Sequence, residues 1–381
     1  MERWPSGLRR TTGNRVYRQK RYRGFKSHPL RMKILMLAQK IHILNLSKEE
    51  LQNIITKKLL QKPYRTKQIL NWIYKKKVDN FKNFSDLPEE LRHKLEEKFE
   101  IYYLKLNSLD ISKIDATTRY NFKTKDEHII PTVFIPKFER NVVCISTQIG
   151  CSIECSFCNS GRVNFVRNLT CGEIVEQIIR VEKDKGKING VLFMGMGEPL
   201  LNYENITKSI KILMDQDMFG LAKRRITVST VGVVPNIYKL AEENLGIKLA
   251  LSLHSYNDKK RKKFVKNLNF KIEDIIKAGI FYVKKTKTKL TIEYVMIKNE
   301  NDTLKDAKGL IEVIKSFTKD KNLVKINLIP LNEIQDIKDL SKPEEENIKA
   351  FKDLLVKSGY LTFVRKTYGI DIQSACGQLG Y

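Results

Sequence analysis

Three cysteines crowd into the segment Gly150-Cys-Ser-Ile-Glu-Cys-Ser-Phe-Cys158. Thiolates at this C-x3-C-x2-C spacing can hold three irons of a [4Fe-4S] cubane and leave the fourth iron open to a non-protein ligand. A structural zinc site needs four closed ligands, and no fourth Cys or His lies nearby in the sequence. A disulfide framework would spread its cysteines over a small secreted domain. We therefore predict that Cys151, Cys155 and Cys158 hold one [4Fe-4S] cluster, with zinc as the less favoured alternative.

Two further cysteines lie far apart in the sequence. Cys376 sits in a polar, glycine-containing segment near the C-terminus, where a core role is a poor fit, so we predict a reactive thiol. Cys144 lies seven residues before the cluster motif. Taken alone, Cys144 could be a small buried hydrophobic residue, which is our prediction for Cys171.

Polar and glycine residues follow several apolar runs and could bind a cofactor. In Gly195-Met-Gly-Glu198 the glycines would let a ligand approach the backbone, and Glu198 offers an acceptor for an ammonium group. His254 ends another apolar run. A single His is more often a surface or core residue, but its expected place on the same rim as the cluster favours a functional role.

A regular alternation of elements from about residue 141 would position these residues. Apolar, β-branched runs alternate with helix-like stretches, as is typical of an α/β fold with a parallel sheet. The predicted strands are Val142–Ser146, Gly190–Met194, Arg225–Ser229, Lys248–Leu253, Lys289–Met296 and Val324–Ile329. The predicted helices are 172–185, 203–217, 235–245, 272–285, 303–319 and 343–358. Because polar residues follow every predicted strand, we expect a barrel-like closure with one functional rim rather than an open doubly wound sheet.

The region before this alternation is predicted to form a small basic helical domain over 40–100 and a β linker region over 101–140. Ser47-Lys-Glu-Glu50 has the pattern of a capping box. One helical face carries a set of apolar residues: Ile69, Leu70, Ile73 and Tyr74. Four lysines on exposed faces would engage RNA phosphates, although any one of them could equally be a solvated residue: Lys67, Lys75, Lys76 and Lys77.

The charge of the chain indicates a polyanionic partner. Lys and Arg total 71 against 43 Asp and Glu, a net charge of +28, which favours RNA or DNA over an acidic membrane surface. Part of this excess could reflect lysine drift in an AT-rich genome. No apolar run approaches the ~18 residues of a membrane span, so we expect a cytoplasmic protein.

Residues 1–31 form a suspect leader, with ten basic residues and one acidic residue. They resemble a tRNA gene read as protein, so we expect the true start at Met32 or Met36. A disordered basic arm and an Arg-rich transit peptide are the alternatives.

The cluster motif, with Phe157 before its last cysteine, resembles that of the radical S-adenosylmethionine (SAM) superfamily. With Cys144 and Cys376 on either side, the chain resembles the dual-specificity 23S rRNA and tRNA adenine-C2 methyltransferases, the RlmN family, from about Leu46 to Leu379. The resemblance includes four stretches: Tyr64-Arg-Thr-Lys-Gln-Ile-Leu-Asn-Trp-Ile-Tyr74, Arg224-Arg-Ile-Thr-Val-Ser-Thr-Val-Gly232, Thr291-Ile-Glu-Tyr-Val-Met296 and Ile326-Asn-Leu-Ile-Pro330. It implies a radical SAM partial (β/α)6 TIM-like barrel over 141–360 and a C-terminal segment over 361–381 with the methyl-carrying cysteine.

The resemblance implies a role for each cysteine. Carbon 2 of adenine is electron-poor and cannot attack S-adenosylmethionine directly, so the family first places the methyl group on a thiolate, matched here by Cys376. A second S-adenosylmethionine yields a 5′-deoxyadenosyl radical that activates this methyl group. Cys144 matches the residue that resolves the RNA adduct through a disulfide with Cys376. The cofactor-binding positions of the family are matched by Gly197, Glu198, Ser229, Ser252, Leu253, His254 and Asn332.

One departure from the family concerns its proton acceptor. Family members often carry a Glu thirteen residues before the Cys matched by Cys144, and this chain has Pro131 there. Either another base such as Asp126 or Glu127 substitutes, or that role is dispensable.

The resemblance also implies substrates and partners. These are adenine 2503 of 23S rRNA, adenine 37 of tRNA, and an external one-electron reductant such as a flavodoxin-like protein. We expect a cytoplasmic monomer with no membrane partner. The alternatives are methylation of carbon 8 of the rRNA adenine, a glycyl-radical activase and a zinc-stabilised RNA-binding protein.

Overall fold

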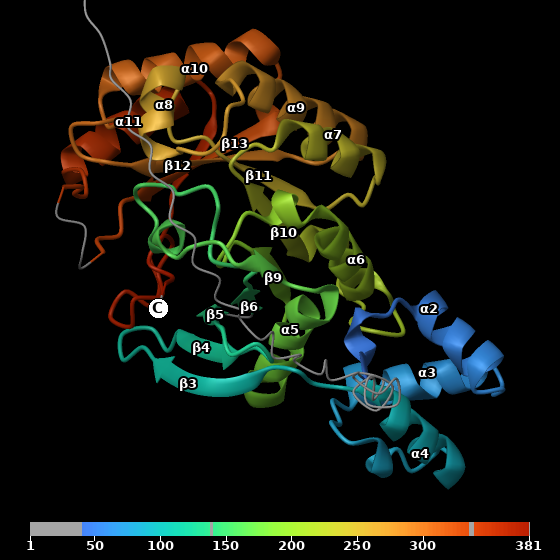
Figure 1. The fold of residues 1–381 in the computed structure, drawn as a ribbon. Coiled ribbons are helices and arrows are strands. Elements are labelled where there is room, and N and C mark those ends of the chain that lie inside the picture. Colours follow the sequence, from blue (N-terminus) through green and yellow to red (C-terminus); the bar gives the residue numbers. More distant parts are fainter. Residues whose placement is uncertain (1–39, 138–139, 335–338, 381) are drawn as a thin grey trace, which may run out of the picture. The chain divides into compact units, whose positions relative to one another are not determined.

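The computed structural model describes residues 40–137, 140–334 and 339–380. The suspect leader over 1–31, with both candidate start codons, lies outside the described residues. Figure 1 shows the central sheet, the helices that follow its strands, and the shorter helices of the N-terminal region. In the part of the chain that is described, no helix combines the length and the apolar character needed to cross a membrane.

Ten strands of the described part form one sheet, in the order β14-β13-β12-β11-β10-β9-β6-β5-β4-β3. All six predicted strands are present, and neighbours pair in parallel. They are β6 (Arg140–Cys144), β9 (Gly190–Phe193), β10 (Ile226–Thr230), β11 (Lys248–Ser252), β12 (Leu290–Met296) and β13 (Val324–Pro330). The parallel strands from β6 to β14 stand side by side in chain order without the reversal of a doubly wound sheet, and β14 and β3 lie at opposite edges, so the predicted partial barrel is confirmed.

The helices that connect the parallel strands were also predicted, with small shifts at their ends. They are α5 (Cys171–Lys185), α6 (Tyr203–Met214), α7 (Val234–Glu242), α9 (Ile272–Thr286), α10 (Leu304–Phe317) and α11 (Glu345–Lys357). Parallel neighbours need such crossover connections. Figure 1 shows α6, α7, α9 and α10 on the same side of the sheet. The sequence did not indicate α8 (Asp258–Phe264), because a run of charged residues up to Phe264 carries no apolar periodicity.

The region expected as a β linker contributes three strands to the central sheet. These are β3 (Lys105–Ile111), β4 (Thr118–Lys123) and β5 (Ile129–Lys137), which pair antiparallel, and β5 pairs with β6. β14 (Leu361–Val364) adds a further parallel strand beside β13. The barrel sheet is therefore extended at both edges beyond the six strands of the sequence pattern.

The N-terminal region is helical, as predicted. It contains α2 (Lys48–Asn53), α3 (Tyr64–Leu70) and α4 (Glu89–Lys98), with one π-helical turn after each of the first two. The predicted capping box of Ser47 and Glu50 opens α2. The predicted apolar face is buried in a cluster that also contains Val175 and Ile179 of α5 and Ile212 of α6. Cys171, the first residue of α5, lies in the same cluster and is a core residue, as expected.

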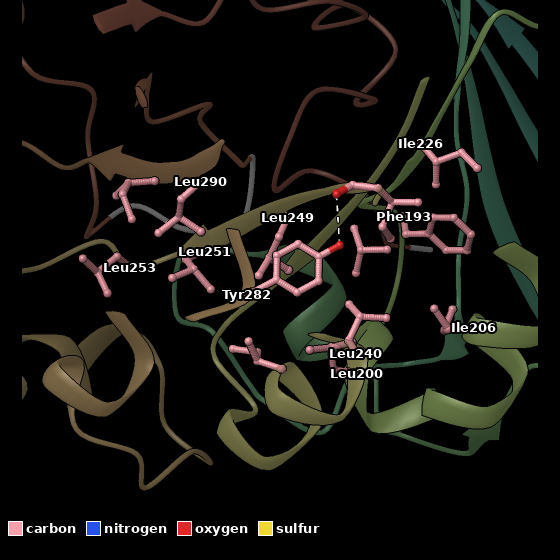
Figure 2. Close-up of a cluster of buried hydrophobic side chains, with 14 of the residues drawn as sticks. Phe193, Leu200, Ile206, Ile226, Leu240, Leu249, Leu251, Leu253, Tyr282 and Leu290 are labelled. Carbon is pink, nitrogen blue, oxygen red and sulfur yellow. Dashed lines mark hydrogen bonds between the residues drawn. The ribbon is translucent and has the colours of Figure 1, made fainter. Parts of the chain in front are cut away.

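The main hydrophobic core lies between the parallel strands and their helices. Figure 2 shows Phe193 of β9, Leu249 and Leu251 of β11, and Tyr282 of α9 packed together. The Tyr282 hydroxyl donates to the Ile247 carbonyl oxygen at 3.0 Å, so its polar atom is satisfied. Burying side chains of this size stabilises the fold by about 1.5–3 kcal/mol each. This core holds the carboxyl ends of the strands, which build the site, in fixed positions.

Candidate active site

One cavity collects almost all of the predicted site residues. It lies at the carboxyl ends of the parallel strands, where (β/α) barrels place their active sites. Ten of the predicted residues line it: Cys151, Cys155, Cys158, Gly197, Glu198, Ser229, Ser252, His254, Asn332 and Cys376. The other two, Leu253 and Cys144, lie directly behind its wall. Side chains distant in the sequence therefore meet at one rim.

The cluster loop, residues 150–162, turns tightly so that its three thiols reach this cavity. Cys158 N donates to Cys155 O at 3.1 Å, and Gly161 N donates to Cys158 O at 3.1 Å. Gly150 has a φ of +74°, and a Cβ there would lie 2.1 Å from Asn164 O, so only glycine fits. Ser156 N donates to the carbonyl oxygen of Phe264 in α8 at 2.9 Å, which ties the loop to the barrel.

The three thiols fit a cluster better than a single ion. Burial raises the pKa of each, to about 12 for Cys151, and neighbouring thiolates raise the pKa values further. A strongly cationic group is therefore needed to hold all three as thiolates. No three His, Cys, Asp or Glu side chains in the described ranges are grouped closely enough for one metal ion. The thiols line a shared space, as ligands of a larger group must.

Glu198 and Gly197 are fixed by the backbone around them. The Glu198 carboxylate accepts from Leu200 N and from Val231 N, each at 2.9 Å, one on each oxygen. Burial raises the pKa of Glu198, and these backbone bonds oppose that shift. Gly197 has a φ of +99°, and a Cβ there would lie 2.5 Å from Gln148 Cβ. We expected a ligand to approach the backbone at this glycine. In the structure, the side chain of Gln148 occupies that space.

His254 is a neutral residue in this cavity. Burial lowers the pKa of its imidazole to about 3. Its Nδ1 accepts from Val295 N at 3.0 Å, so the ring hydrogen must lie on Nε2. Leu253, beside it, has its side chain in the main core, and its carbonyl oxygen accepts from Arg261 Nε at 3.1 Å. Leu253 therefore supports the wall and does not line the cavity.

Two serines and an asparagine contribute neutral polar groups. Ser229 Oγ of β10 lies 3.2 Å from Ser252 Oγ of β11. Asn332, just after β13, donates from Nδ2 to Cys376 O at 2.9 Å and accepts from Thr367 Oγ1 at 3.0 Å. Asn332 thus links the barrel rim to the segment that carries Cys376.

The C-terminal segment, residues 365–380, is held beside the cavity by hydrogen bonds from distant parts of the chain. Asn159 of the cluster loop donates from its backbone N to Gly377 O at 2.7 Å and from Nδ2 to Gln378 O at 3.2 Å. Arg119 of β4 donates to Gln373 O at 3.2 Å and also to Gly380 O. These hydrogen bonds place Cys376 at the cavity, where part of the residue is open to solvent while the packed atoms around its thiol raise the pKa of that thiol.

Cys144 lies behind Cys376 in the interior. It is buried with Val133 and Leu379, and burial raises the pKa of its thiol to about 12. Cys376 and Arg365 both act on the pKa of Cys144, so the two thiols are within electrostatic reach of each other. All six cysteines lie in the described residues and are free thiols. The expected disulfide between Cys144 and Cys376 is therefore absent from this state of the protein.

Sequence reasoning missed two charged residues of the cavity, Glu293 and Arg365. Arg365 Nη1 lies 3.7 Å from Glu293 Oε2, and Asn327 Nδ2 donates to Glu293 Oε1 at 2.9 Å. Arg365 lowers the pKa of Cys376, whereas burial and Glu293 raise it, with burial the largest effect. A signal was present, because Glu293 is the single charged residue in a strand, β12, that is buried throughout.

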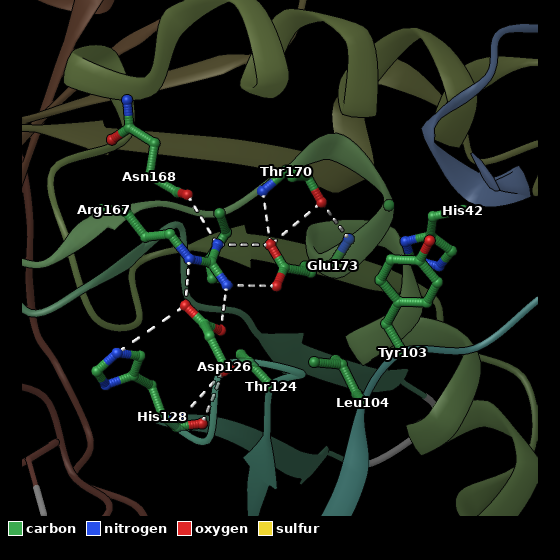
Figure 3. A network of polar contacts seen from close by, with 12 residues as sticks. His42, Tyr103, Leu104, Thr124, Asp126, His128, Arg167, Asn168, Thr170 and Glu173 are labelled. Carbon is green, nitrogen blue, oxygen red and sulfur yellow. Dashed lines mark hydrogen bonds and ion pairs between the residues drawn. The ribbon is translucent and has the colours of Figure 1, made fainter. Parts of the chain in front are cut away.

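The two acids considered in place of the Glu missing at Pro131 lie outside the cavity. Figure 3 shows Asp126 paired with Arg167, which also binds Glu173. This pairing holds the pKa of Asp126 well below its usual range. Glu127 is exposed and pairs with a lysine at 2.7 Å. Neither acid is placed to act on a molecule bound among the cysteines.

The four lysines predicted to bind RNA differ in their surroundings. Lys75 and Lys76 are exposed, and Lys76 Nζ lies 3.4 Å from the centre of the Trp72 ring. Lys67 pairs with Asp217 at 3.4 Å, although its side chain is 76% exposed. The side chain of Lys77 is only 23% exposed and pairs with Glu182 at 3.4 Å. Lys75 and Lys76 are thus the most available, and the expectation of free exposure is wrong for Lys77.

Comparisons with known proteins cover both the helical region and the barrel. Residues 145–311 match the family model of the radical SAM superfamily. Residues 41–101 match the model of the ribosomal RNA large subunit methyltransferase N-terminal domain.

Two curated relatives carry the name "Probable dual-specificity RNA methyltransferase RlmN". The protein of Endomicrobium trichonymphae is 46% identical over 92% of this chain and 100% of its own length. The protein of Thermotoga petrophila is 46% identical over 89% of this chain and 97% of its own. Among solved structures, a radical SAM methyltransferase from Sphaerobacter thermophilus has a TM-score of 0.83 at 34% identity, and the match covers 89% of this chain and 98% of that one.

Proposed function

We propose that this chain, which belongs to the RlmN family of radical SAM RNA methyltransferases, places a methyl group on carbon 2 of an adenine in RNA. Membership of the family makes the chain an enzyme and excludes the zinc-stabilised RNA-binding protein. The carbon atom, the RNA and the individual steps are our proposal. The observation that carries it is the presence of Cys376, a thiol from the end of the chain, in the cavity of the three cluster thiols.

We assign the [4Fe-4S] cluster to Cys151, Cys155 and Cys158. When bound, the cluster and S-adenosylmethionine supply a transferable methyl group and, after one-electron reduction, a 5′-deoxyadenosyl radical. The wall that would hold S-adenosylmethionine comprises Gly197, Glu198, Ser229, Ser252, His254 and Asn332, with Leu253 behind it. Glu198 offers a remaining lone pair on each oxygen to an ammonium group, and the serines and the neutral His254 offer uncharged hydrogen bonds.

Cys376 first acts as a nucleophile. Its thiol loses a proton, the sulfur attacks the methyl carbon, and the new S–CH3 bond forms as the methyl–sulfonium bond breaks and S-adenosylhomocysteine leaves. Arg365 favours this step because its guanidinium lowers the pKa of Cys376 against the effect of burial. The methyl group on Cys376 then gives one hydrogen atom to the deoxyadenosyl radical of a second S-adenosylmethionine. Two molecules of S-adenosylmethionine are thus consumed per turnover.

The methylene radical on Cys376 adds to carbon 2 and joins the enzyme to the RNA. The adduct radical gives up one electron, which the cluster would accept when bound, and the hydrogen on carbon 2 leaves as a proton. Cys144, as its thiolate, attacks the sulfur of Cys376 and breaks the bond from that sulfur to the methylene carbon. The methylene carbon takes up a proton and becomes the methyl group. The two sulfurs stay joined only until an external dithiol reduces them.

The family name of the relatives guides the proposed substrates and partners. We propose adenine 2503 of 23S rRNA and adenine 37 of tRNA as substrates, with Lys75 and Lys76 bound to phosphates. A flavodoxin-like protein would supply the single electron. We also propose that the protein acts as a monomer in the cytoplasm, where these RNAs occur.

Cys376→Ala tests the proposal. We expect the variant to keep the absorption of its cluster and to form no 2-methyladenine, as measured by nucleoside mass mapping of rRNA and tRNA. Continued methylation of adenine by Cys376→Ala would overturn the role of this thiol. A wild-type product methylated at carbon 8 would overturn the assignment to carbon 2.

A further inference from the structure

Glu293 is a buried acid that has no role in the methyl-transfer steps proposed for this chain. It lines the active-site cavity and is 4% exposed. A buried carboxylate costs free energy unless its oxygens are paired. Its Oε1 accepts from Asn327 Nδ2 at 2.9 Å, whereas its Oε2 has no hydrogen-bond partner within the described ranges. One carboxylate oxygen in the cavity is therefore open to accept a hydrogen.

The charged neighbours of Glu293 keep this oxygen available. Arg365 Nη1 lies 3.7 Å from Oε2, which is too long for a hydrogen bond, so this cation stands beside the oxygen without occupying it. Glu293 raises the pKa of Cys376, so the carboxylate is within electrostatic reach of the thiol that would carry the methyl group. The acid, the cation and the thiol therefore share one corner of the cavity.

The proposed reaction needs a base at this place. Carbon 2 must lose its hydrogen as a proton while a single methylene group joins it to the Cys376 sulfur. A base must therefore come within hydrogen-bond reach of a carbon held beside that sulfur. Two acids and one His line the described cavity. Both oxygens of Glu198 accept backbone hydrogen bonds, and Nδ1 of His254 does the same. Glu293 alone among these three has a side-chain acceptor atom that receives no hydrogen bond, and the lone pairs that remain on Glu198 are assigned to the ammonium group of S-adenosylmethionine.

We propose that Glu293 is the base that takes the carbon-2 proton from the adenine–Cys376 adduct. The C–H bond breaks, its electron pair stays in the ring, and the proton passes to Oε2 of Glu293. Cys144 then releases the product, and Glu293 returns its proton to solvent. This inference rests on the proposed function. It also explains how the chain can carry Pro131 without an acid at that position.

Glu293→Gln is the first test, because the amide keeps the shape of the side chain and its bond with Asn327. We expect Cys376 to be methylated at least as fast as in the wild type, because Glu293 raises the pKa of this thiol, and 5′-deoxyadenosine to be formed in the first turnover. We expect 2-methyladenine to fall by about 10²–10⁴-fold, the usual contribution of a general base. A covalent RNA–protein adduct through Cys376 should accumulate, visible on a denaturing gel and by peptide mass. With RNA deuterated at carbon 2, this adduct should keep its deuterium.

Two further variants separate a base from a structural residue. Glu293→Asp keeps a carboxylate and should restore part of the product, even if Glu293→Gln folds poorly. Glu182→Gln is the matched control, because Glu182 is a buried acid on α5 that pairs with Lys77 away from the cavity. It should turn over at the wild-type rate. Melting temperature and cluster absorption are measured for each variant.

Several outcomes would overturn the role of Glu293. Wild-type product formation by Glu293→Gln would do so, and so would loss of Cys376 methylation, since Glu293 would then act before the adduct. Failure of the proposed function is recognised separately, from the position of the methyl group in the wild-type product. If that position is another ring carbon that carries hydrogen, adduct accumulation in Glu293→Gln still reports on Glu293, because that hydrogen must also leave.

Discussion

The cluster loop and the C-terminal segment bring thiols to the same cavity by different means. In the cluster loop, residues 150–162, short-range hydrogen bonds and two glycines, Gly150 and Gly161, turn three cysteines toward the same space. In the C-terminal segment, residues 365–380, hydrogen bonds from distant parts of the chain hold Cys376 in place, and they come from Asn159, Arg119 and Asn332. The first arrangement is local and the second depends on the whole fold.

This difference separates two parts of the chemistry. A locally formed loop that binds a cluster is compatible with many reactions. A thiol that long-range contacts place in the same cavity restricts the cavity to reactions that use this thiol. Damage to the cluster loop should therefore remove all activity. Damage to the C-terminal segment should spare the cluster and stop the reaction at a later, identifiable stage.

The largest effect is expected from Cys158→Ala in the cluster loop. Loss of one of three thiolates should prevent stable binding of the cluster. Iron content and visible absorption after anaerobic purification should fall to background, together with 5′-deoxyadenosine and methylated RNA. A fully active Cys158→Ala enzyme would contradict the assignment of the cluster.

Cys144→Ala should stop the reaction after the cluster has done its work. The variant should bind the cluster and methylate Cys376, because Cys144 lies behind the cavity. Product should fall by about 10²-fold or more, since no thiolate remains to attack the sulfur of the adduct. RNA deuterated at carbon 2 sharpens the result: the trapped adduct should have lost its deuterium, in contrast to the adduct of Glu293→Gln. Rapid release of methylated RNA by Cys144→Ala would remove this thiol from the mechanism.

Arg119→Met tests the attachment of the C-terminal segment. The side chain of Arg119 holds Gln373 O and Gly380 O, so its loss should loosen the position of Cys376. We expect a 10- to 100-fold slower methylation of Cys376, because small misplacements of reacting groups have effects of about this size. Cluster absorption should not change. Arg167→Met, which removes an ion-paired arginine outside the cavity, is the control and should leave the methylation rate intact. Equal rates in both variants would contradict this account of the segment.

The methylation of Cys376 should depend on pH. Burial raises the pKa of Cys376, so its reactive thiolate is scarce at neutral pH and increases as the pH rises. The rate of Cys376 methylation, followed by peptide mass, should therefore increase steadily from about pH 7 to about pH 9. Arg365→Met should move the profile to higher pH, because Arg365 lowers this pKa. A flat profile would mean that the thiolate is not the limiting species.

The smallest effect is expected outside both regions, in the N-terminal helices. Replacing Lys75 and Lys76 together by alanine should weaken RNA binding a few-fold. The slope of log K for binding against the logarithm of the salt concentration should become shallower by about one unit for each phosphate that is no longer neutralised. Lys77→Ala is the matched control, because Lys77 is paired with Glu182. Binding measured over a series of salt concentrations checks this. An unchanged slope in the double variant would place the RNA elsewhere.

Local patterns in the sequence predicted the frame and the cluster loop. The six parallel strands and their helices follow from apolar periodicity, and the prediction that Cys151, Cys155 and Cys158 hold a cluster rests on their spacing. The pairing of β3–β5 and β14 with the barrel could not be predicted, because strand partners distant in sequence leave no periodic signal. Glu293 was visible as the single charged residue of a buried strand, but its role and that of Arg365, just after β14, could not be predicted, because they depend on the side chains that face them in the folded chain. The role of Leu253 as support, and not as lining, also required the packed structure.

Isotopic labelling tests directly whether Cys376 carries the methyl group to RNA. S-adenosylmethionine with a trideuterated methyl group is supplied to the reduced enzyme with RNA. We expect the label on the Cys376 peptide and a methyl group in the product that contains two deuterium atoms and one hydrogen. One deuterium is lost to 5′-deoxyadenosine, and one proton from solvent replaces it. A product methyl group that keeps all three deuterium atoms would contradict the account, because the methyl group would then have passed to the RNA intact.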